Sequence, residues 1–178
     1  MSILCVFDPS TPQLPNKVLT HAEDITAALA EHGVSLMQAE HGLRVRPGTL
    51  HDEMMDACQA HLDHIMTTHG CRAHGVINRD GVEDQGPDLR DEHVLDTDEV
   101  IVVVSGRVQV GLRLGAEVYS VMCEKGDQLR VPAGTRRWLE LGEAPFCLAF
   151  RLFATEAGSQ LAFTGDASAR AFLGIDEL

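Results

Sequence analysis

His93 and Glu99 are the two residues of this sequence whose types and spacing best support chemistry. Both lie in a run rich in β-branched residues (93–104), and side chains alternate between the two faces of a strand. One face therefore carries an imidazole, a carboxylate and three uncharged side chains: His93, Leu95, Thr97, Glu99 and Ile101. The neighbouring acids Asp96 and Asp98 fall on the other face. An imidazole and a carboxylate on one face can transfer protons or bind a metal ion.

Two other groups of potential ligands have a simpler interpretation. His61 and His64 stand one turn apart on a predicted helix, but His64 points away from the apolar stripe, which is typical of a solvated face. The five cysteines are widely spaced and include no CxxC pair, so we expect free thiols rather than disulfides or a thiolate zinc site. No histidine follows His93, so a site in the β-rich region has this one imidazole.

The elements that must position these residues divide the chain into a helical first third and a β-rich remainder. Apolar spacing predicts helices over 21–32, with a capping box at Thr20 and Glu23, and over about 50–68. A polar stretch (78–91) separates them from short strands broken by glycines, predicted at 93–104, 107–113, 116–123, 128–131, 137–141 and 146–153. Such strands are typical of a sandwich or a small barrel.

Length and charge limit the classes of partner. A chain of 178 residues fits one domain, and its 44% hydrophobic content supports a packed core. With 14 basic and 27 acidic residues the net charge is −13, which argues against nucleic acid and against an anionic membrane surface. The apolar N-terminal run (3–7) is too short for a signal or a spanning segment. We therefore expect a soluble, cytoplasmic protein that binds a small molecule; its oligomeric state stays open.

Several segments resemble the cupin barrel and, within it, the acireductone dioxygenase family. The core of the resemblance lies in Glu92-His93, Asp98-Glu99-Val100, Cys123 to Asp127 and Val131 to Thr135. Residues 1–7, 31–34, 138, 149–153 and 163–165 extend it nearly to both ends. The resemblance implies a mainly β, cupin-type double-stranded β-helix barrel with N-terminal α-helices packed outside. We expect a single cupin domain over 1–178, with a helical region (1–71), a barrel core (72–157) and a C-terminal extension (158–178).

The resemblance also implies four ligands for Fe(II) or Ni(II), and two of them are replaced. The first signature has His-x-His followed by Glu, whereas this chain has His93, Leu95 and Glu99. The second signature ends in a histidine, and that position is Arg137. An alkyl side chain cannot coordinate, and a guanidinium repels a dication. We therefore expect no cofactor and no metal, with His93 and Glu99 as residual ligand positions; the alternative is a bound Fe(II) or Ni(II).

Arg137 supplies a fixed positive charge at the lost ligand position. We expect it to form a bidentate pair with Glu99, because an unpaired buried carboxylate is costly. The alternative is that Arg137 extends to solvent beside Arg136. Where the family has substrate-contacting aromatic residues this chain differs, and the residues we expect to contact a substrate are Arg136, Thr97, Ile101, Leu139 and Ser159.

Three functions remain open. The first hypothesis is a repurposed, metal-independent isomerase, cyclase or lyase in which His93, Glu99 and Arg137 are catalytic and act by acid–base chemistry on a small metabolite. The second is a non-catalytic paralogue that binds a small molecule or a partner. The third, implied by the resemblance, is a divergent acireductone dioxygenase that oxidises 1,2-dihydroxy-3-keto-5-methylthiopentene in methionine salvage.

Overall fold

The computed structural model describes residues 2–81 and 88–178, so the central part of the predicted polar stretch, residues 82–87, lies outside the described residues. Its elements in chain order are β1 (Ile3–Phe7), β2 (Lys17–Leu19), α1 (Ala22–Ala30), β3 (Ser35–Gln38), α2 (His51–His69), β4 (Ala73–Asp80), β5 (His93–Val94), β6 (Glu99–Leu114), β7 (Glu117–Glu124), β8 (Asp127–Val131), β9 (Arg137–Glu140), β10 (Phe146–Phe153), η1 (Ala157–Ser159), β11 (Ala162–Phe163) and η2 (Ala167–Ala171).

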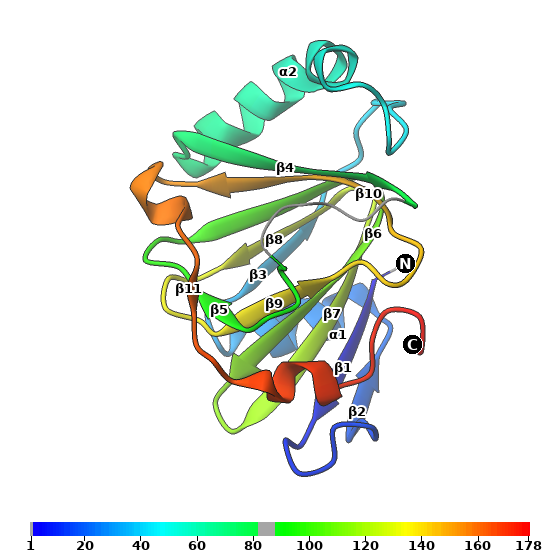
Figure 1. Ribbon diagram of the computed structural model, residues 1–178, viewed down its shortest axis with the longest axis vertical. Helices are drawn as coiled ribbons and strands as arrows, with labels where there is room; N and C mark the ends of the chain where they lie inside the picture. The colour runs from blue at the N-terminus through cyan, green and yellow to red at the C-terminus, as the bar shows by residue number, and fades with distance from the viewer. Residues whose placement is uncertain (1, 82–87) are drawn as a thin grey trace.

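The long strand β6 joins two antiparallel layers (Figure 1). Its first half pairs with β8 and β10, which in turn pair with β3 and β4. Its second half pairs with β7 and β9, and this layer continues to β1 and β2 on one side and to β5 and β11 on the other. Gly106 lies between the halves at φ +77°, where a Cβ would collide with the backbone carbonyl of Phe146. This glycine lets one strand serve both layers.

Side-chain alternation along β6 separates the barrel interior from the outer helix. Ile101 and Val103 belong to the main core cluster, which also contains Ile25 and Leu29 of α1. The intervening Val100, Val102 and Val104 face outward and pack with the apolar stripe of α2, made of Met54, Cys58, Leu62 and Ile65. Figure 1 shows α2 lying outside the barrel over β4 and β10. The strand parity expected from the sequence therefore holds, and Glu99 lies on the inward face.

The predicted mainly β barrel is confirmed, and several predicted elements match closely, whereas others change. The helices predicted over 21–32 and 50–68 appear as α1 and α2. The capping box is wrong, because α1 begins after His21 without a side-chain cap hydrogen bond. The strands predicted at 93–104 and 107–113 are instead the short β5 and the continuous β6. Five strands were not predicted: β1, β2 and β3 within the first 71 residues, β4, whose end overlaps the predicted polar stretch, and β11.

Among the described residues, no helix combines the length and the apolar character needed to cross a membrane.

Candidate functional site

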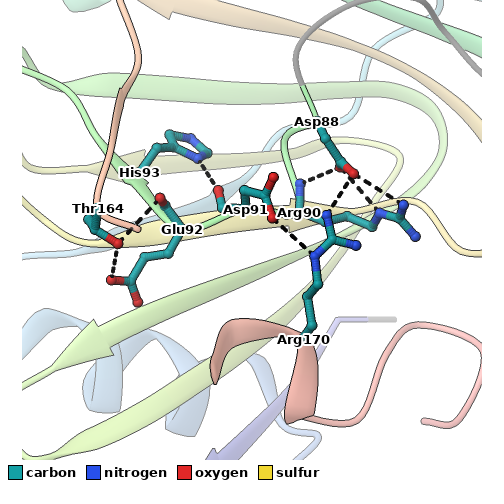
Figure 2. Close-up of polar contacts among 7 residues, drawn as sticks. All are labelled: Asp88, Arg90, Asp91, Glu92, His93, Thr164 and Arg170. Atoms are coloured by element: carbon teal, nitrogen blue, oxygen red, sulfur yellow. Dashed lines mark hydrogen bonds and ion pairs between the residues drawn. The ribbon is translucent and has the colours of Figure 1, made fainter. Parts of the chain in front are cut away.

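His93 is held at the barrel interior by the two-residue strand β5, which pairs with β9 and β11. Its ring is fully buried, and Nδ1 lies 2.8 Å from the carbonyl oxygen of Asp91 (Figure 2). Because a carbonyl oxygen accepts only, Nδ1 carries the hydrogen and Nε2 presents a lone pair. Nε2 is buried and has no hydrogen-bond partner among the described residues. Burial lowers the pKa of His93, which favours the neutral ring.

Glu99 opens β6 with its carboxylate buried against Arg151 of β10. Arg151 Nη2 donates to Oε2 at 2.8 Å, and its Nη2 and Nε donate to Oε1 at 3.3 Å. The guanidinium of Arg151 also lies over the ring of Phe153, 5.3 Å from its centroid. The carboxylate is therefore fixed by a charged fork that is itself packed against an aromatic ring.

Arg137, on β9, is fully buried and points toward the same carboxylate. Its Nε donates to the carbonyl of Thr135 at 3.1 Å, and its Nη2 donates to the carbonyl of Pro132 at 2.9 Å. Its Nη1 lies 3.9 Å from Glu99 Oε2, which is an ion pair longer than a hydrogen bond. The alternative that Arg137 extends to solvent is wrong.

The bidentate partner predicted for Glu99 is thus a different arginine. Arg137 is unavailable for that role because two of its nitrogens are already bonded to the turn before β9. Arg151 takes it instead. Burial lowers the pKa of Arg137, while the attraction of Glu99 raises it. We call His93, Glu99, Arg137 and Arg151 the interior cluster.

Sequence reasoning missed Arg151 as a member of this cluster. The signal was present, because Arg151 is the one charged residue in the strand Phe146–Phe153. Alternation places it on the same face as the buried Cys147 and Ala149. A lone charge on an inward strand face predicts a buried partner, and that partner is Glu99.

The other expected substrate contacts fall into two groups. Ile101 and Leu139 are buried in the core cluster. Leu95, at the replaced ligand position, is buried beside Phe153. Thr97 is half-buried and Arg136 is exposed. Ser159 is half-buried in η1, where its Oγ donates to the carbonyl of Glu156. The structure therefore brings the apolar members near the interior cluster and leaves the polar ones outside it.

A second charged group lies outside the barrel, on the other side of β5. Arg170 Nη2 donates to Asp88 at 2.7 Å and to Asp91 at 2.9 Å, and Arg90 Nη2 donates to Asp88 at 3.2 Å (Figure 2). We call Asp88, Arg90, Asp91 and Arg170 the rim cluster. Because the Asp91 carbonyl accepts from His93, the rim cluster holds the backbone that orients the imidazole.

Glu92 connects this segment to the C-terminal part of the chain. Its buried carboxylate pairs with Arg113. Figure 2 shows that it also accepts a hydrogen bond from Thr164 Oγ1, at 2.8 Å. Arg113 lies over the rings of Trp138 and Phe172. Glu92 and His93 therefore point to opposite sides of β5, and the outward side anchors the C-terminal extension.

Comparisons with known proteins agree with this architecture. The ARD/ARD' family model matches residues 53–160. Proteins named acireductone dioxygenase from Pseudomonas savastanoi pv. phaseolicola and Pseudomonas fluorescens are each 41% identical over 181 residues, covering 99% of this chain and 100% of the relative. The solved acireductone dioxygenase from Bacillus anthracis, described with a cadmium ion in its active center, matches with TM-score 0.71 at 20% identity. That match covers 92% of this chain and 98% of the other, and it confirms the cupin-type fold.

The expectation that no cofactor is needed is wrong. It is overturned by the relatives' dioxygenase name and by the cadmium ion in the Bacillus anthracis structure, which together imply a metal centre in this family. The residues described here do not supply a full ligand set for one. Within residues 2–81 and 88–178, no three His, Cys, Asp or Glu side chains lie where they could hold a metal ion together. His93 and Glu99 are the two donors at the expected place, beside Leu95 and Arg137.

Proposed function

Because the chain belongs to the acireductone dioxygenase family, we propose that it is a divergent acireductone dioxygenase whose reaction centre is the interior cluster. The observation that carries the proposal is the 41% identity to proteins of that name over essentially the whole chain. The retention of His93 and Glu99, both buried in the barrel, supports the same position for the centre.

His93 is the residue that can move a proton in this centre. Its Nδ1–H is engaged by the Asp91 carbonyl, so Nε2 is left as a fixed acceptor. An acireductone carries enediol hydroxyl groups, and a neutral imidazole with a free lone pair is suited to accept one of their protons. Glu99 is less suited to that role, because its oxygens already accept hydrogen bonds from Arg151.

The comparisons favour this proposal over the metal-independent acid–base enzyme that was the first hypothesis from the sequence. The relatives reported above all carry the dioxygenase name, and the matching solved structure is described with a metal ion. Fe(II) and Ni(II), the ions implied by the resemblance, are therefore the ones to supply in an assay. The incomplete ligand set favours one second candidate, a paralogue that binds an acireductone without oxidising it.

Oxygen uptake with an acireductone, measured on protein purified without a histidine tag, tests the proposal. The protein is assayed as purified and after loading with Fe(II) or Ni(II), with its metal content measured in parallel. We expect oxygen consumption that depends on the metal and falls roughly 10²- to 10⁴-fold in His93→Gln, as expected for loss of a general base. The control is Arg46→Gln, an exposed residue that pairs with Asp80 at the opposite end of β4 and β10 from Arg151. Saturable binding without oxygen uptake would favour the second candidate and overturn the first.

A further inference from the structure

Two buried polar atoms of the interior cluster lack a hydrogen-bond partner among the described residues: Nε2 of His93 and Nη1 of Arg137. Both side chains are fully buried. Their residues lie opposite each other where β5 pairs with β9. Buried polar groups are nearly always paired, because an unpaired one forfeits its hydrogen bonds to water. Two such atoms on facing strands therefore point to a ligand.

The charges of the cluster indicate the sign of that ligand. Arg137 and Arg151 each carry a positive charge, and Glu99 is the one carboxylate that both face. His93 beside them adds no negative charge, because an imidazole is either neutral or cationic. Asp98 also acts on Arg137, but it lies at the surface in an ion pair with Arg130. The cluster itself therefore holds at least one positive charge in excess, in a place with almost no solvent to screen it. A bound monoanion would balance it.

The hydrogen-bonding roles of the two atoms restrict the ligand further. Arg137 Nη1 can only donate, so it requires an acceptor such as an oxyanion. Nε2 of His93 can only accept while Nδ1–H bonds the Asp91 carbonyl, so it requires a donor such as a hydroxyl. Because His93 and Arg137 are direct partners on neighbouring strands, we expect the complementary ligand to carry both groups close together on a small molecule.

We propose that Arg137 and His93 form a recognition site for a small monoanion that carries a hydroxyl on the carbon next to its oxyanion-bearing carbon. α-Hydroxycarboxylates and enediolates share this chemistry. The inference deepens the proposed function, on which it rests for the location of the centre, and it assigns ligand recognition to an arginine that stands where the family resemblance implies a histidine. Its test measures binding and not turnover.

Calorimetric titration of the purified protein with ascorbate, a stable enediolate monoanion, tests the role of Arg137. The titration is run under nitrogen so that the probe is not oxidised. We expect saturable binding that weakens roughly ten- to hundredfold in Arg137→Gln, because a charge-assisted hydrogen bond is lost. Arg46→Gln is the matched control, since it removes an arginine that is 74% exposed and pairs at the other end of β4 and β10 from Arg151. Equal affinity of Arg137→Gln and the parent protein, or no binding to the parent, would overturn the proposal.

A second titration uses the unchanged protein, so it holds even where Arg137→Gln fails to fold. Glycolate and acetate carry the same charge, but acetate is smaller and has no hydroxyl. We expect glycolate to displace ascorbate at roughly tenfold lower concentration, because acetate leaves His93 Nε2 unpaired. Equal displacement would overturn the role of His93. Binding that follows these expectations without oxygen uptake would overturn the dioxygenase proposal alone, whereas oxygen uptake with unchanged binding in Arg137→Gln would overturn this one alone.

Discussion

The interior cluster and the rim cluster lie on either side of the short strand β5. Both contain carboxylate and guanidinium groups, but those of the interior cluster are buried and those of the rim cluster are exposed. In the interior, the side chains of Glu99, Arg137 and Arg151 are 0–10% exposed. At the rim, those of Asp88 and Arg170 are 41% and 42% exposed. Water screens the rim charges, so each ion pair there contributes little stability. The interior charges have lost their hydration and are stabilised by their attraction to each other. Removing one of them therefore leaves a buried charge without a partner.

This difference assigns different roles to the two clusters. The interior cluster combines two unpartnered buried atoms on facing strands with an excess of positive charge, which suits it to the ligand recognition proposed above. The rim cluster is internally paired and holds the Asp91 backbone, so it positions the imidazole from outside. A residue change in the first should alter stability and binding together, whereas a change in the second should have small effects on both.

The largest effect is expected for Glu99→Gln. The substitution keeps the size of the side chain but removes the carboxylate that faces two buried guanidinium groups. We expect a loss of about 3–5 kcal/mol in the free energy of unfolding, measured by urea denaturation. Asp88→Asn is the control in the rim cluster and should cost less than about 1 kcal/mol. Similar losses in the two variants would contradict the comparison.

The second prediction tests whether the barrel has kept the geometry of a metal centre. The double substitution Leu95→His with Arg137→His would place imidazoles at the two positions where the resemblance implies them, beside His93 and Glu99. We expect the double variant to bind Ni(II) at least roughly tenfold more tightly than the parent protein, because a set of imidazoles and one carboxylate suits this ion. The control, Leu95→Met with Arg137→Gln, removes the buried charge without adding ligands. Equal affinity in all three proteins would show that the backbone has moved from the family arrangement.

Much of the fold was predictable because it depends on local patterns. The stripe of α2 and the alternation of β6 follow from periodicity alone, and both appear in the structure. The strands β1 to β3 were missed because each has only three to five residues. β1 and β3 pair with β7 and β8, about a hundred positions away in the sequence, and β2 pairs with β1. No local pattern indicates such distant pairing.

The interior cluster was predictable in part for the same reason. Strand parity placed His93 and Glu99 on one inward face, and both are fully buried. The partner of Glu99 was not predictable from parity, since it depends on which strand lies beside β6 and on what already binds each guanidinium. Arg137 donates hydrogen bonds to the carbonyl oxygens of Thr135 and Pro132. Because β10 pairs with β6, Arg151 lies beside Glu99 and forms the bidentate contact instead.

A third group, a pair of half-buried histidines, extends the comparison. His41 and His61 have ring centroids 5.1 Å apart, and burial lowers the pKa of both. The nearby charge of Lys125 lowers the pKa of His41 further. The neighbouring His41 and His64 lower the pKa of His61 further. The unfolded imidazoles therefore take up protons first, so stability should fall as the pH drops below about 6.5.

The variant His61→Gln should reduce that acid sensitivity. We expect its free energy of unfolding to change less between about pH 6.5 and 5 than that of the parent protein, by under about 1 kcal/mol because these rings are only partly shielded from water. Thermal denaturation at the two pH values measures the effect. His51→Gln, at an exposed position on the same helix, is the control. An equal change in both variants would mean that the pair does not titrate as its burial implies.

The smallest effect is expected for Arg170→Ala in the rim cluster. Arg170 bridges Asp88 and Asp91, but all three side chains are more than a third exposed. The loss in the free energy of unfolding at neutral pH should therefore be well under about 1 kcal/mol and should shrink further in salt.

The effect of Arg170 should also depend on pH. Hydrogen bonds from Arg90 and Arg170 lower the pKa of Asp88. A carboxyl group with a lowered folded-state pKa stabilises the fold above its unfolded value of about 3.9 and loses that contribution as the pH falls through the folded value. The difference between Arg170→Ala and the parent protein should therefore be present at pH 7 and decline below about pH 4. Urea denaturation at several pH values measures it, with the exposed pair variant Arg46→Ala as control. A loss as large as that of Glu99→Gln would mean that the exposed ion pairs of the rim cluster stabilise the fold as much as the buried ones do, and the distinction between the two clusters would fail.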